Sequence, residues 1–284
     1  MKVPTILRPI SNELRLVQAE VESQLLQINT TALSGFQTIT ERAVNHLFRV
    51  HGKYLRPALV LLTAQALNDR YPARPEALVK IAAAVELVHS ASLVHDDIID
   101  KADERRGQPS VNSVFGNRMA VLIGDLLYDQ VFTLLAELTQ LGPETQVALF
   151  NLFTSTARKM CLGEIYDDQI QIEPAAVTFD QYLQVIDYKT ASLMSCCCQA
   201  SAIALGANDE DRTAVQEFGF HLGRTYQLVD DMIDQDSVFF DRDRMLARSS
   251  RETGLCQDAL RRIGDNDGTR RLATITQAVV DRQK

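Results

Sequence analysis

Apolar residues recur at helical spacing along most of the chain. The segments that show this spacing are Pro9 to Ile28, Leu55 to Leu67, Pro75 to Asp100, Arg118 to Leu138, Glu144 to Gln169, Phe179 to Leu205 and Asp209 to Asp234. Pro75 and Pro143 suit the first turn of a helix, where proline is tolerated. Alternation of apolar and polar residues, which indicates strands, is almost absent. The pattern predicts an all-α fold, a bundle of about ten helices around a central active-site cavity.

Composition supports long helices and a single unit. The 284 residues are 46% hydrophobic, and 13 Gly and 8 Pro are few strand or loop punctuators, which favours long helices. We find no repeat of fixed period, no low-complexity linker and no break in composition. We therefore expect one domain over residues 1–284.

The charge balance and the cysteine content argue against a nucleic-acid-binding protein and for reduced thiols. The 37 acidic residues exceed the 29 Lys and Arg, which argues against nucleic acid as a partner because phosphate backbones select basic surfaces. No apolar run approaches the ~18 residues of a membrane span, and Met1 to Arg8 lacks the apolar region of a signal peptide. We therefore expect a cytoplasmic protein without a membrane span. The 5 cysteines suit small, reduced core residues.

Two matching acidic motifs end two of the predicted apolar helices. The first is Asp96-Asp97-Ile98-Ile99-Asp100 and the second is Asp230-Asp231-Met232-Ile233-Asp234. The first and last Asp of each motif share a helix face, with Cβ atoms roughly 5–6 Å apart. If the motifs face each other across a cleft, like charges ~6 Å apart repel by roughly 3 kcal/mol per pair at an effective dielectric of ~20. This repulsion favours Mg²⁺ shared with a diphosphate, whereas the plainer alternative is two solvated helix ends.

Basic and polar residues suited to phosphate lie near these motifs in the sequence. Lys53 and Arg56 precede a predicted helix, where side-chain charge and free N–H groups can hold one phosphate. Arg105 and Arg106 form an adjacent pair in a turn and can address two phosphates. The remaining polar candidates are Lys189, Thr190 and Gln227. Each of these residues alone is better explained as an exposed polar side chain, and only their distribution around the two acidic motifs favours a phosphate site.

With these motifs, the chain resembles the polyprenyl synthetase family of trans-isoprenyl diphosphate synthases between about Gly52 and Asp234. The matching segments are Gly52 to Pro57, Glu86 to Asp100, Arg105 to Gly107, Gly124 to Leu127, Gly163-Glu164, Lys189 to Leu193 and Gly223 to Asp231. The resemblance implies an enzyme that lengthens an allylic diphosphate with isopentenyl diphosphate, and we expect a homodimer.

The resemblance also implies roles for individual residues. Those expected to bind isopentenyl diphosphate are Lys53, Arg56, His89 and Arg106. Those expected to hold the allylic diphosphate are Arg105, Lys189, Thr190 and Gln227. The main magnesium ligands would be Asp96, Asp100 and Asp230, with support from Asp97, Asp231 and Asp234. The residues counted as catalytic are Asp96, Asp97, Asp100, Lys189, Asp230 and Asp231.

The expected chemistry uses metal and basic groups to stabilise departing pyrophosphate, so that an allylic cation forms and the double bond of isopentenyl diphosphate attacks it. In the family the released pyrophosphate takes the final proton, and no His–carboxylate pair is recognisable here as a general base. His89 and His95 then need no role as bases.

The segment after the second motif departs from the family pattern. The family continues with Gly-Lys pairs, whereas this chain reads Gln235 to Arg244 without lysine. Arg242 or Arg244 would substitute in holding the allylic diphosphate, or the segment is a charged surface loop.

Two other functions share some of these features. A class I terpene cyclase would carry Ser or Thr and Glu where this chain has Asp234 and Val238. A non-catalytic subunit of a heteromeric synthase would be expected to have eroded motifs, and both motifs are intact. Ala91 and Ser92, five and four positions before Asp96, are small residues where the family uses aromatic ones to stop growth near farnesyl diphosphate. We therefore expect a product of geranylgeranyl size or longer.

Overall fold

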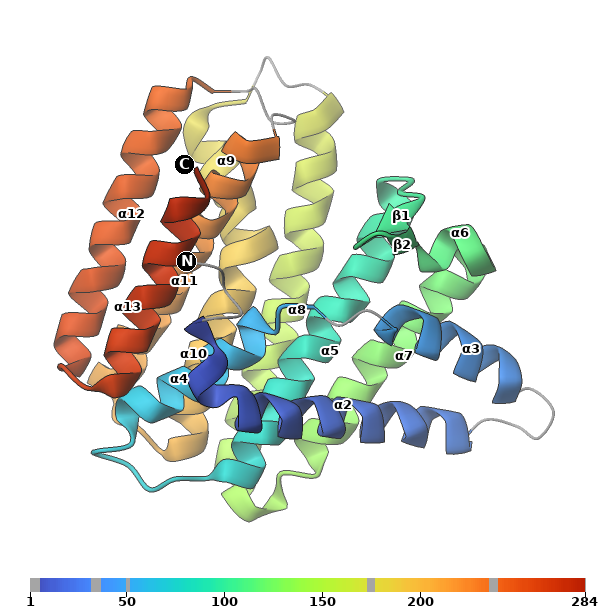
Figure 1. The fold of residues 1–284 in the computed structure, drawn as a ribbon, viewed down its shortest axis with the longest axis horizontal. Helices are drawn as coiled ribbons and strands as arrows, with labels where there is room; N and C mark the ends of the chain where they lie inside the picture. The colour runs from blue at the N-terminus through green and yellow to red at the C-terminus, as the bar shows by residue number, and fades with distance from the viewer. Residues whose placement is uncertain (1–5, 32–36, 50–51, 173–176, 235–239, 284) are drawn as a thin grey trace.

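The computed structural model describes residues 6–31, 37–49, 52–172, 177–234 and 240–283; of Asp234 it describes the backbone and not the side chain. Within them the chain is almost entirely helical, as predicted (Figure 1). The α-helices are α2 Ser11–Thr31, α3 Gln37–Phe48, α4 Leu55–Leu67, α5 Pro75–Ile99, α6 Val111–Phe115, α7 Asn117–Ala136, α8 Pro143–Ile172, α9 Phe179–Ile186, α10 Ser192–Leu205, α11 Asp209–Asp234, α12 Arg242–Ile263 and α13 Asp267–Val280.

Short elements connect these helices. They are the 3-10 turns η1 Arg8–Ile10, η2 Thr139–Leu141 and η5 Asp281–Gln283, the π-helical turn η4 Asp187–Ala191, and the strands β1 Glu104–Arg105 and β2 Gln108–Pro109. The two strands form an antiparallel hairpin directly after α5, so the turn predicted around Arg105 and Arg106 is a small β-hairpin.

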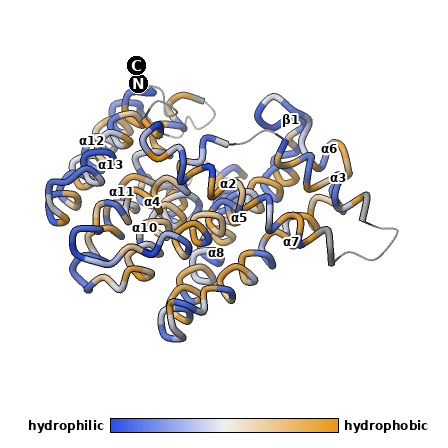
Figure 2. The backbone as a smooth tube through the Cα atoms, turned by 60° about the horizontal axis from the view of Figure 1, so that its bottom comes forward, coloured by the Kyte–Doolittle hydropathy of each residue, from blue (hydrophilic) through white to orange (hydrophobic). Residues whose placement is uncertain are grey.

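The core lies where α5 and α10 pass through the bundle. Helix α5 packs against α2, α4, α7 and α10, and α10 packs against α4, α8 and α11. Figure 2 shows apolar segments on these inner helices, whereas the outer helices α12 and α13 carry more hydrophilic stretches. A helix enclosed by other helices must be apolar on all sides, which explains why α5 and α10 have apolar residues on every face.

Four of the cysteines behave as predicted. Cys196, Cys197, Cys198 and Cys256 are buried free thiols of the core, and burial raises the pKa of each. Cys161 on α8 differs, because its thiol is exposed.

Among the described residues, two helices are long and apolar enough to cross a membrane by length and composition, α5 and α7. This differs from the expectation that no apolar run approaches that length. The most apolar window of α5 is 72% buried inside the bundle, and that of α7 is 44% buried. A buried core helix satisfies the same criterion, so the finding is weak support for a membrane span.

The helices that the apolar pattern missed are mostly polar or short. Helix α12 begins at Arg242, with the Asp241 side chain accepting from the Asp243 N–H as its cap, so Arg242 and Arg244 belong to a helix rather than to a loop. Its apolar stripe is narrow because most of its residues face solvent. Residues 235–239 of the atypical segment lie outside the described residues.

Candidate active site

The first aspartate motif divides its side chains between two directions. Asp96 lines a cavity between α5, α7 and α8, whereas Asp97 is 3% exposed and accepts from Nε of Arg105 at 2.7 Å. Asp100 caps the end of α5 and is exposed. Consecutive side chains of a helix point about 100° apart, so Asp96 and Asp97 face different neighbours. Asp96 and Asp100 remain as the pair available to a ligand, while Asp97 anchors the hairpin through Arg105.

The second motif is also divided. Asp230 pairs with Nη1 of Arg282 from η5 at 2.6 Å. Asp231 accepts from Nε2 of Gln227 at 2.7 Å and from the Tyr182 hydroxyl. Asp234 is the last residue of α11, and its side chain lies outside the described residues.

Lys189 connects the surroundings of the two motifs. Its Nζ lies 2.9 Å from the carboxylate of Glu164 and 2.6 Å from that of Asp167, both on α8. These two carboxylates raise the pKa of Lys189 although burial opposes the charge. The ammonium is therefore permanently charged and held at the wall of the cavity.

A hydrogen-bonded series links the neighbouring residue to the second motif. The Thr190 hydroxyl donates to Oε1 of Gln227 at 2.6 Å, and Gln227 donates in turn to Asp231. The structure thus brings together Lys189, Thr190 and Gln227, three of the four residues expected to hold the allylic diphosphate. Arg105, the fourth, contacts Asp97 of the first motif.

Charged and apolar side chains both line the cavity, which has a volume of about 680 Å³. Asp96, Glu164 and Lys189 lie close together in this lining and are called its charged end, and Asp125 and Asp168 line the cavity as well. The lining residues on α5, α7 and α8 that provide a less polar surface include Ser92, Ile99, Val121, Tyr128, Met160, Cys161 and Ile165. Such a site accommodates a molecule with an anionic head and a hydrocarbon tail.

Ser92 and Ala91 differ in their relation to this cavity. Ser92 lines it and donates its hydroxyl to the carbonyl of His89 at 2.9 Å. Ala91 is 0% exposed and belongs to the hydrophobic core. Of the two small residues singled out in the sequence, Ser92 is the one in contact with the cavity.

The charged end carries an excess of negative charge. Burial raises the pKa of Asp96 to about 7, with Glu164 and Asp100 adding to the rise while Lys189 and Arg105 oppose it. Burial also raises the pKa of Asp231, against hydrogen bonds from Tyr182 and Gln227. Because burial disfavours the ionised form of these carboxylates, a cation bound nearby would stabilise that form.

This donor set fits magnesium in one particular way. Within the described ranges, no group of three His, Cys, Asp or Glu side chains is arranged to hold an ion unaided. Mg²⁺ commonly takes one or two protein carboxylates and completes its shell with water and substrate phosphates. Asp96 lines the cavity, and with Asp100 one turn further along α5 it offers hard oxygen donors that match that mode of binding. Asp230 does not line this cavity and pairs with Arg282.

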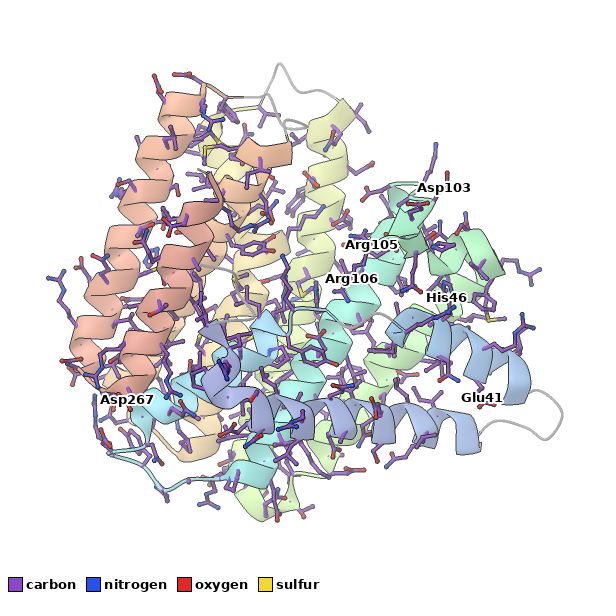
Figure 3. All side chains as sticks on the ribbon, in the orientation of Figure 1. Glu41, His46, Asp103, Arg105, Arg106 and Asp267 are labelled. Carbon is purple, nitrogen blue, oxygen red and sulfur yellow. The ribbon has the colours of Figure 1, made fainter. Side chains whose placement is uncertain are left out.

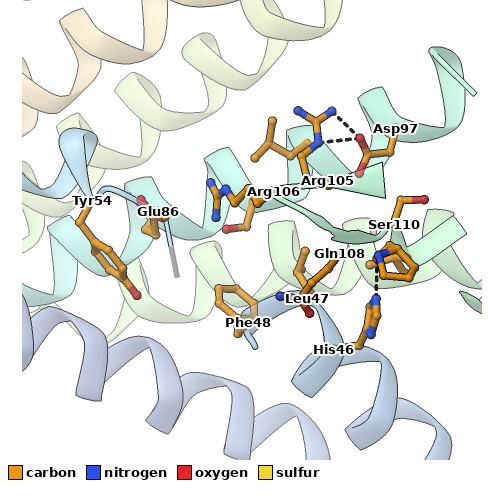
Figure 4. A pocket seen from close by; sticks show the side chains of 15 residues that line it. His46, Leu47, Phe48, Tyr54, Glu86, Asp97, Arg105, Arg106, Gln108 and Ser110 are labelled. Carbon is orange, nitrogen blue, oxygen red and sulfur yellow. Dashed lines mark hydrogen bonds and ion pairs between the residues drawn. The ribbon is translucent and has the colours of Figure 1, made fainter. Parts of the chain in front are cut away.

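A second basic cluster lies on the other side of α5, between α3, α4 and the hairpin (Figure 4). Figure 3 shows Arg105 and Arg106 on the hairpin, above His46 of α3, and Arg106 lies in the turn between the two strands. The guanidinium of Arg106 lies against Gly52, where a Cβ would approach its Nη2 to 2.8 Å. Glu86, which is buried, lines the same pocket.

Arg56 and His89 stand close to this cluster. Nη1 of Arg56 donates to Nε2 of His89 at 3.0 Å. Burial, together with Arg56, Arg106 and Arg105, holds the pKa of His89 well below its usual value, so its ring is neutral. The structure thus brings together Arg56, His89 and Arg106, whereas Lys53 is exposed.

His95 is a helix-packing residue, as its position in the sequence suggested. Its Nε2 donates to the carbonyl of Val121 at 3.2 Å, and a Cβ at Gly124 would overlap its ring. Glycine at 124 therefore allows α7 to approach α5 closely.

Several residues of the site were not identified from the sequence. Glu164 and Asp167 lie one turn apart on α8, and this i, i+3 acidic spacing after Gly163 was a usable signal. Tyr182, Glu86 and Arg282 gave no comparable signal, because their roles depend on contacts between helices distant in sequence.

A helical bundle in which α5 and α11 each end in an aspartate-rich motif, with a cavity beside the first motif, has the isoprenoid synthase fold. The chain belongs to the polyprenyl synthetase family, whose model matches residues 37–238. It is 36% identical over 228 residues to a prenyl transferase of Synechocystis, covering 79% of this chain and 68% of the relative. It is 37% identical to the geranylgeranyl diphosphate synthase of Saccharolobus solfataricus, covering 78% and 66% of the two chains.

The fold is also that of a solved structure. A polyprenyl synthase from Caulobacter crescentus, crystallised with calcium and isoprenyl diphosphate, superposes with a TM-score of 0.80 at 22% identity, covering 100% of this chain and 98% of that chain. The matched stretches cover 54% to 68% of the lengths of the curated relatives.

Proposed function

We propose that this chain is a magnesium-dependent prenyltransferase that joins isopentenyl diphosphate to an allylic diphosphate and releases pyrophosphate. The observation that carries the proposal is the cavity lined by the charged cluster of Asp96, Glu164 and Lys189 together with apolar side chains of α5, α7 and α8. This arrangement matches an amphiphilic diphosphate, and the intact carboxylates favour catalysis over a non-catalytic subunit. The cyclase alternative is disfavoured because Asp234 and Val238 replace the residues of its second motif.

In this proposal the two ends of the substrate have separate partners. Lys189, Thr190 and Gln227 bind the allylic diphosphate from the side of η4 and α11, and Asp96, Asp100 and Asp230 hold magnesium against it. The metal supplies charge that stabilises the departing pyrophosphate. The cavity wall keeps water from the allylic carbon while the carbon–oxygen bond breaks.

The second substrate is placed by the basic cluster across α5. Arg56 and Arg106 bind the diphosphate of isopentenyl diphosphate, and neutral His89 donates or accepts a hydrogen bond without adding charge. Glu86 balances part of the positive charge of this cluster. The proton lost from the carbon beside the new cation passes to the released pyrophosphate. His95 and Asp125 line the cavity 3.6 Å apart, but Nε2 of His95 also donates to the Val121 carbonyl, so we assign this pair to helix packing and not to proton transfer.

The proposed product is geranylgeranyl diphosphate or longer. Ser92 is small and lines the cavity four residues before Asp96, so no side chain at this position stops the growing tail. Tyr128 of α7 lines the same cavity and is a candidate for its far limit.

We further propose a homodimer formed through α7 and α8. Large apolar side chains are exposed on these helices, among them Val121, Leu122, Phe132 and Val147. Exposed apolar residues that gather on one face indicate a protein contact. The five free thiols fit a reducing compartment, and we propose the cytoplasm on that ground.

The direct test is condensation by the purified chain. Radiolabelled isopentenyl diphosphate and an allylic diphosphate are incubated with Mg²⁺ or with EDTA, and products are sized by chromatography. Asp96→Ala and Asp230→Ala are each expected to lower kcat by at least ~100-fold while the helical content is kept. Asp258→Ala on the surface of α12 is the matched control. Near-normal turnover in either site variant would refute the metal assignment, and no wild-type product would refute the proposed activity.

A further inference from the structure

The residues that address the allylic diphosphate sit on an unusual piece of backbone. Lys189 and Thr190 belong to η4, a π-helical turn of 5 residues between α9 and α10. Turns of this type are rare and occur often at functional sites, because the wide turn displaces side chains from their α-helical positions. A backbone of this kind needs support from its neighbours to remain in one conformation.

Two glycines enclose this turn from opposite sides. A Cβ at Gly163 of α8 would overlap the backbone N of Lys189, and a Cβ at Gly223 of α11 would overlap Cα of Ala191. Both glycines have helical neighbours, so their role is close approach rather than backbone freedom. The η4 backbone is therefore seated directly between α8 and α11.

The residue after Gly223 fixes the start of the turn. Arg224 donates from Nε to Oδ1 of Asp187 at 2.5 Å and from Nη2 to Oδ2 at 2.8 Å. Both side chains are mostly buried, and the parallel pair of hydrogen bonds defines position and orientation together. Asp187 is the first residue of η4, two positions before Lys189.

The third nitrogen of Arg224 connects this pair to α12. Nη1 lies 3.1 Å from Oε1 of Glu252, a carboxylate that is 0% exposed. Glu252 also accepts from Arg248 Nε at 2.5 Å and from His221 Nδ1 at 2.5 Å. Glu252 of α12 thus fixes the guanidinium of Arg224, which binds Asp187 of η4 through its other two nitrogens.

We propose that Asp187 and Arg224 are positioning residues, whose ion pair holds η4 so that Lys189 and Thr190 are directed at the allylic diphosphate. The inference rests on the proposed function for the role of Lys189 and Thr190. Neither Asp187 nor Arg224 lines the cavity, so their effect passes through the backbone of the turn.

If the Asp187–Arg224 ion pair positions η4, its loss should weaken binding of the allylic diphosphate and leave binding of isopentenyl diphosphate unchanged. Asp187→Asn and Arg224→Lys each keep a polar side chain of similar size but lose the bidentate geometry. Each is expected to raise KM for the allylic diphosphate by about tenfold, the scale of losses for partners that orient a ligand-binding group. KM for isopentenyl diphosphate, bound across α5, is expected to stay within twofold.

The matched control is Arg262→Gln, which removes another ion pair between α12 and α11, with Glu217, away from the turn. Two readouts do not need turnover. One is binding of inorganic pyrophosphate with Mg²⁺ by calorimetry, and the other is hydrogen exchange of the amides of residues 187–191. Both site variants are expected to weaken binding about tenfold and to speed exchange in η4, and the control is expected to do neither.

The double variant Asp187→Asn with Arg224→Lys adds a coupling test. Because the two residues act as one unit, its defect is expected to be no larger than that of either single change. Unchanged allylic KM, pyrophosphate binding and η4 exchange in soluble, folded variants would overturn the proposal. If the wild-type chain failed to condense substrates, the proposed function would fail, and the exchange of η4 would still decide whether this pair holds the turn.

Discussion

Nη1 of Arg282 lies 2.6 Å from Oδ1 of Asp230, and the guanidinium carbon lies 5.2 Å from the centre of the Tyr226 ring. A cation from η5 thereby neutralises the first carboxylate of the second motif. In the proposed enzyme this carboxylate holds magnesium, so arginine and metal compete for it.

Removing this arginine is therefore expected to ease metal binding. For Arg282→Ala we expect the Mg²⁺ concentration at half-maximal activity to fall about two- to fivefold, the range that a partly exposed ion pair of ~0.5–1 kcal/mol allows. Arg282→Lys keeps the charge and is the control. A higher Mg²⁺ requirement in the Ala variant would show instead that Arg282 assists substrate binding.

The different surroundings of Ser92 and Ala91 predict different outcomes for phenylalanine. Ser92→Phe fills part of the cavity beside Asp96 and is expected to shorten the product without abolishing condensation. Ala91→Phe forces a large ring into a closed core and is expected to cost about 1–3 kcal/mol of unfolding free energy. Product chromatography and thermal melts distinguish the two. Equal shortening by both variants would contradict the assignment of the cavity wall.

Arg244 and Arg242 are expected to differ although both begin α12. The guanidinium of Arg244 lies 4.3 Å from the ring centre of Phe179 and 5.8 Å from that of Phe240, a cation–π contact worth ~0.5–1 kcal/mol at an exposed site. Arg244→Ala should lower the melting temperature slightly and leave the allylic KM unchanged. Arg242 is exposed, and a raised allylic KM in Arg242→Ala alone would identify it as the substitute for the family's loop lysine. Unchanged kinetics in both variants would make this end of α12 a surface feature.

Glu252 predicts how stability depends on pH. Burial opposes its ionisation, but the hydrogen bond from His221 and the charges of Arg224 and Arg248 outweigh burial and hold the pKa below 4.5. The folded state therefore favours the carboxylate, so this stabilisation is present above about pH 4.5 and is lost as pH falls through the lower folded-state pKa. Glu252→Gln should lose ~3 kcal/mol at pH 7. The difference from wild type in denaturant melts should shrink below pH 4.5, and a difference that grew with acid would contradict the assignment.

Most of the architecture could be predicted from the apolar pattern, but its polar parts could not. The ranges proposed for α5 and α11 agree closely with the structure, because α5 is apolar over most of its length and α11 keeps apolar residues at helical spacing. Helix α12 was missed because its residues are largely charged and its packing stripe is narrow. The continuous range from Phe179 to Leu205 also concealed η4, since a π-helical turn inserts one extra residue per turn without any change in composition.

The residues of the candidate site could be named from the sequence, but the directions in which their side chains point could not. Asp96 and Asp97 are identical in sequence, yet one lines the cavity and the other binds Arg105. This division depends on where α8 and the hairpin fall around α5. Lys189 could be identified from its motif, whereas its two partners on α8 required the fold.

Cys161 is exposed and lines the cavity, so its chemical labelling can report whether the cavity is occupied. The other four cysteines are buried, so a small alkylating reagent should label one position, beside Ser92 and Asp96 in the cavity. Partial burial of this thiol in the cavity wall and the nearby Asp96 raise its pKa, so labelling is efficient at alkaline pH. The rate of labelling then measures occupancy of the cavity directly, by mass spectrometry and without turnover, for any hydrocarbon tail offered to the native sequence.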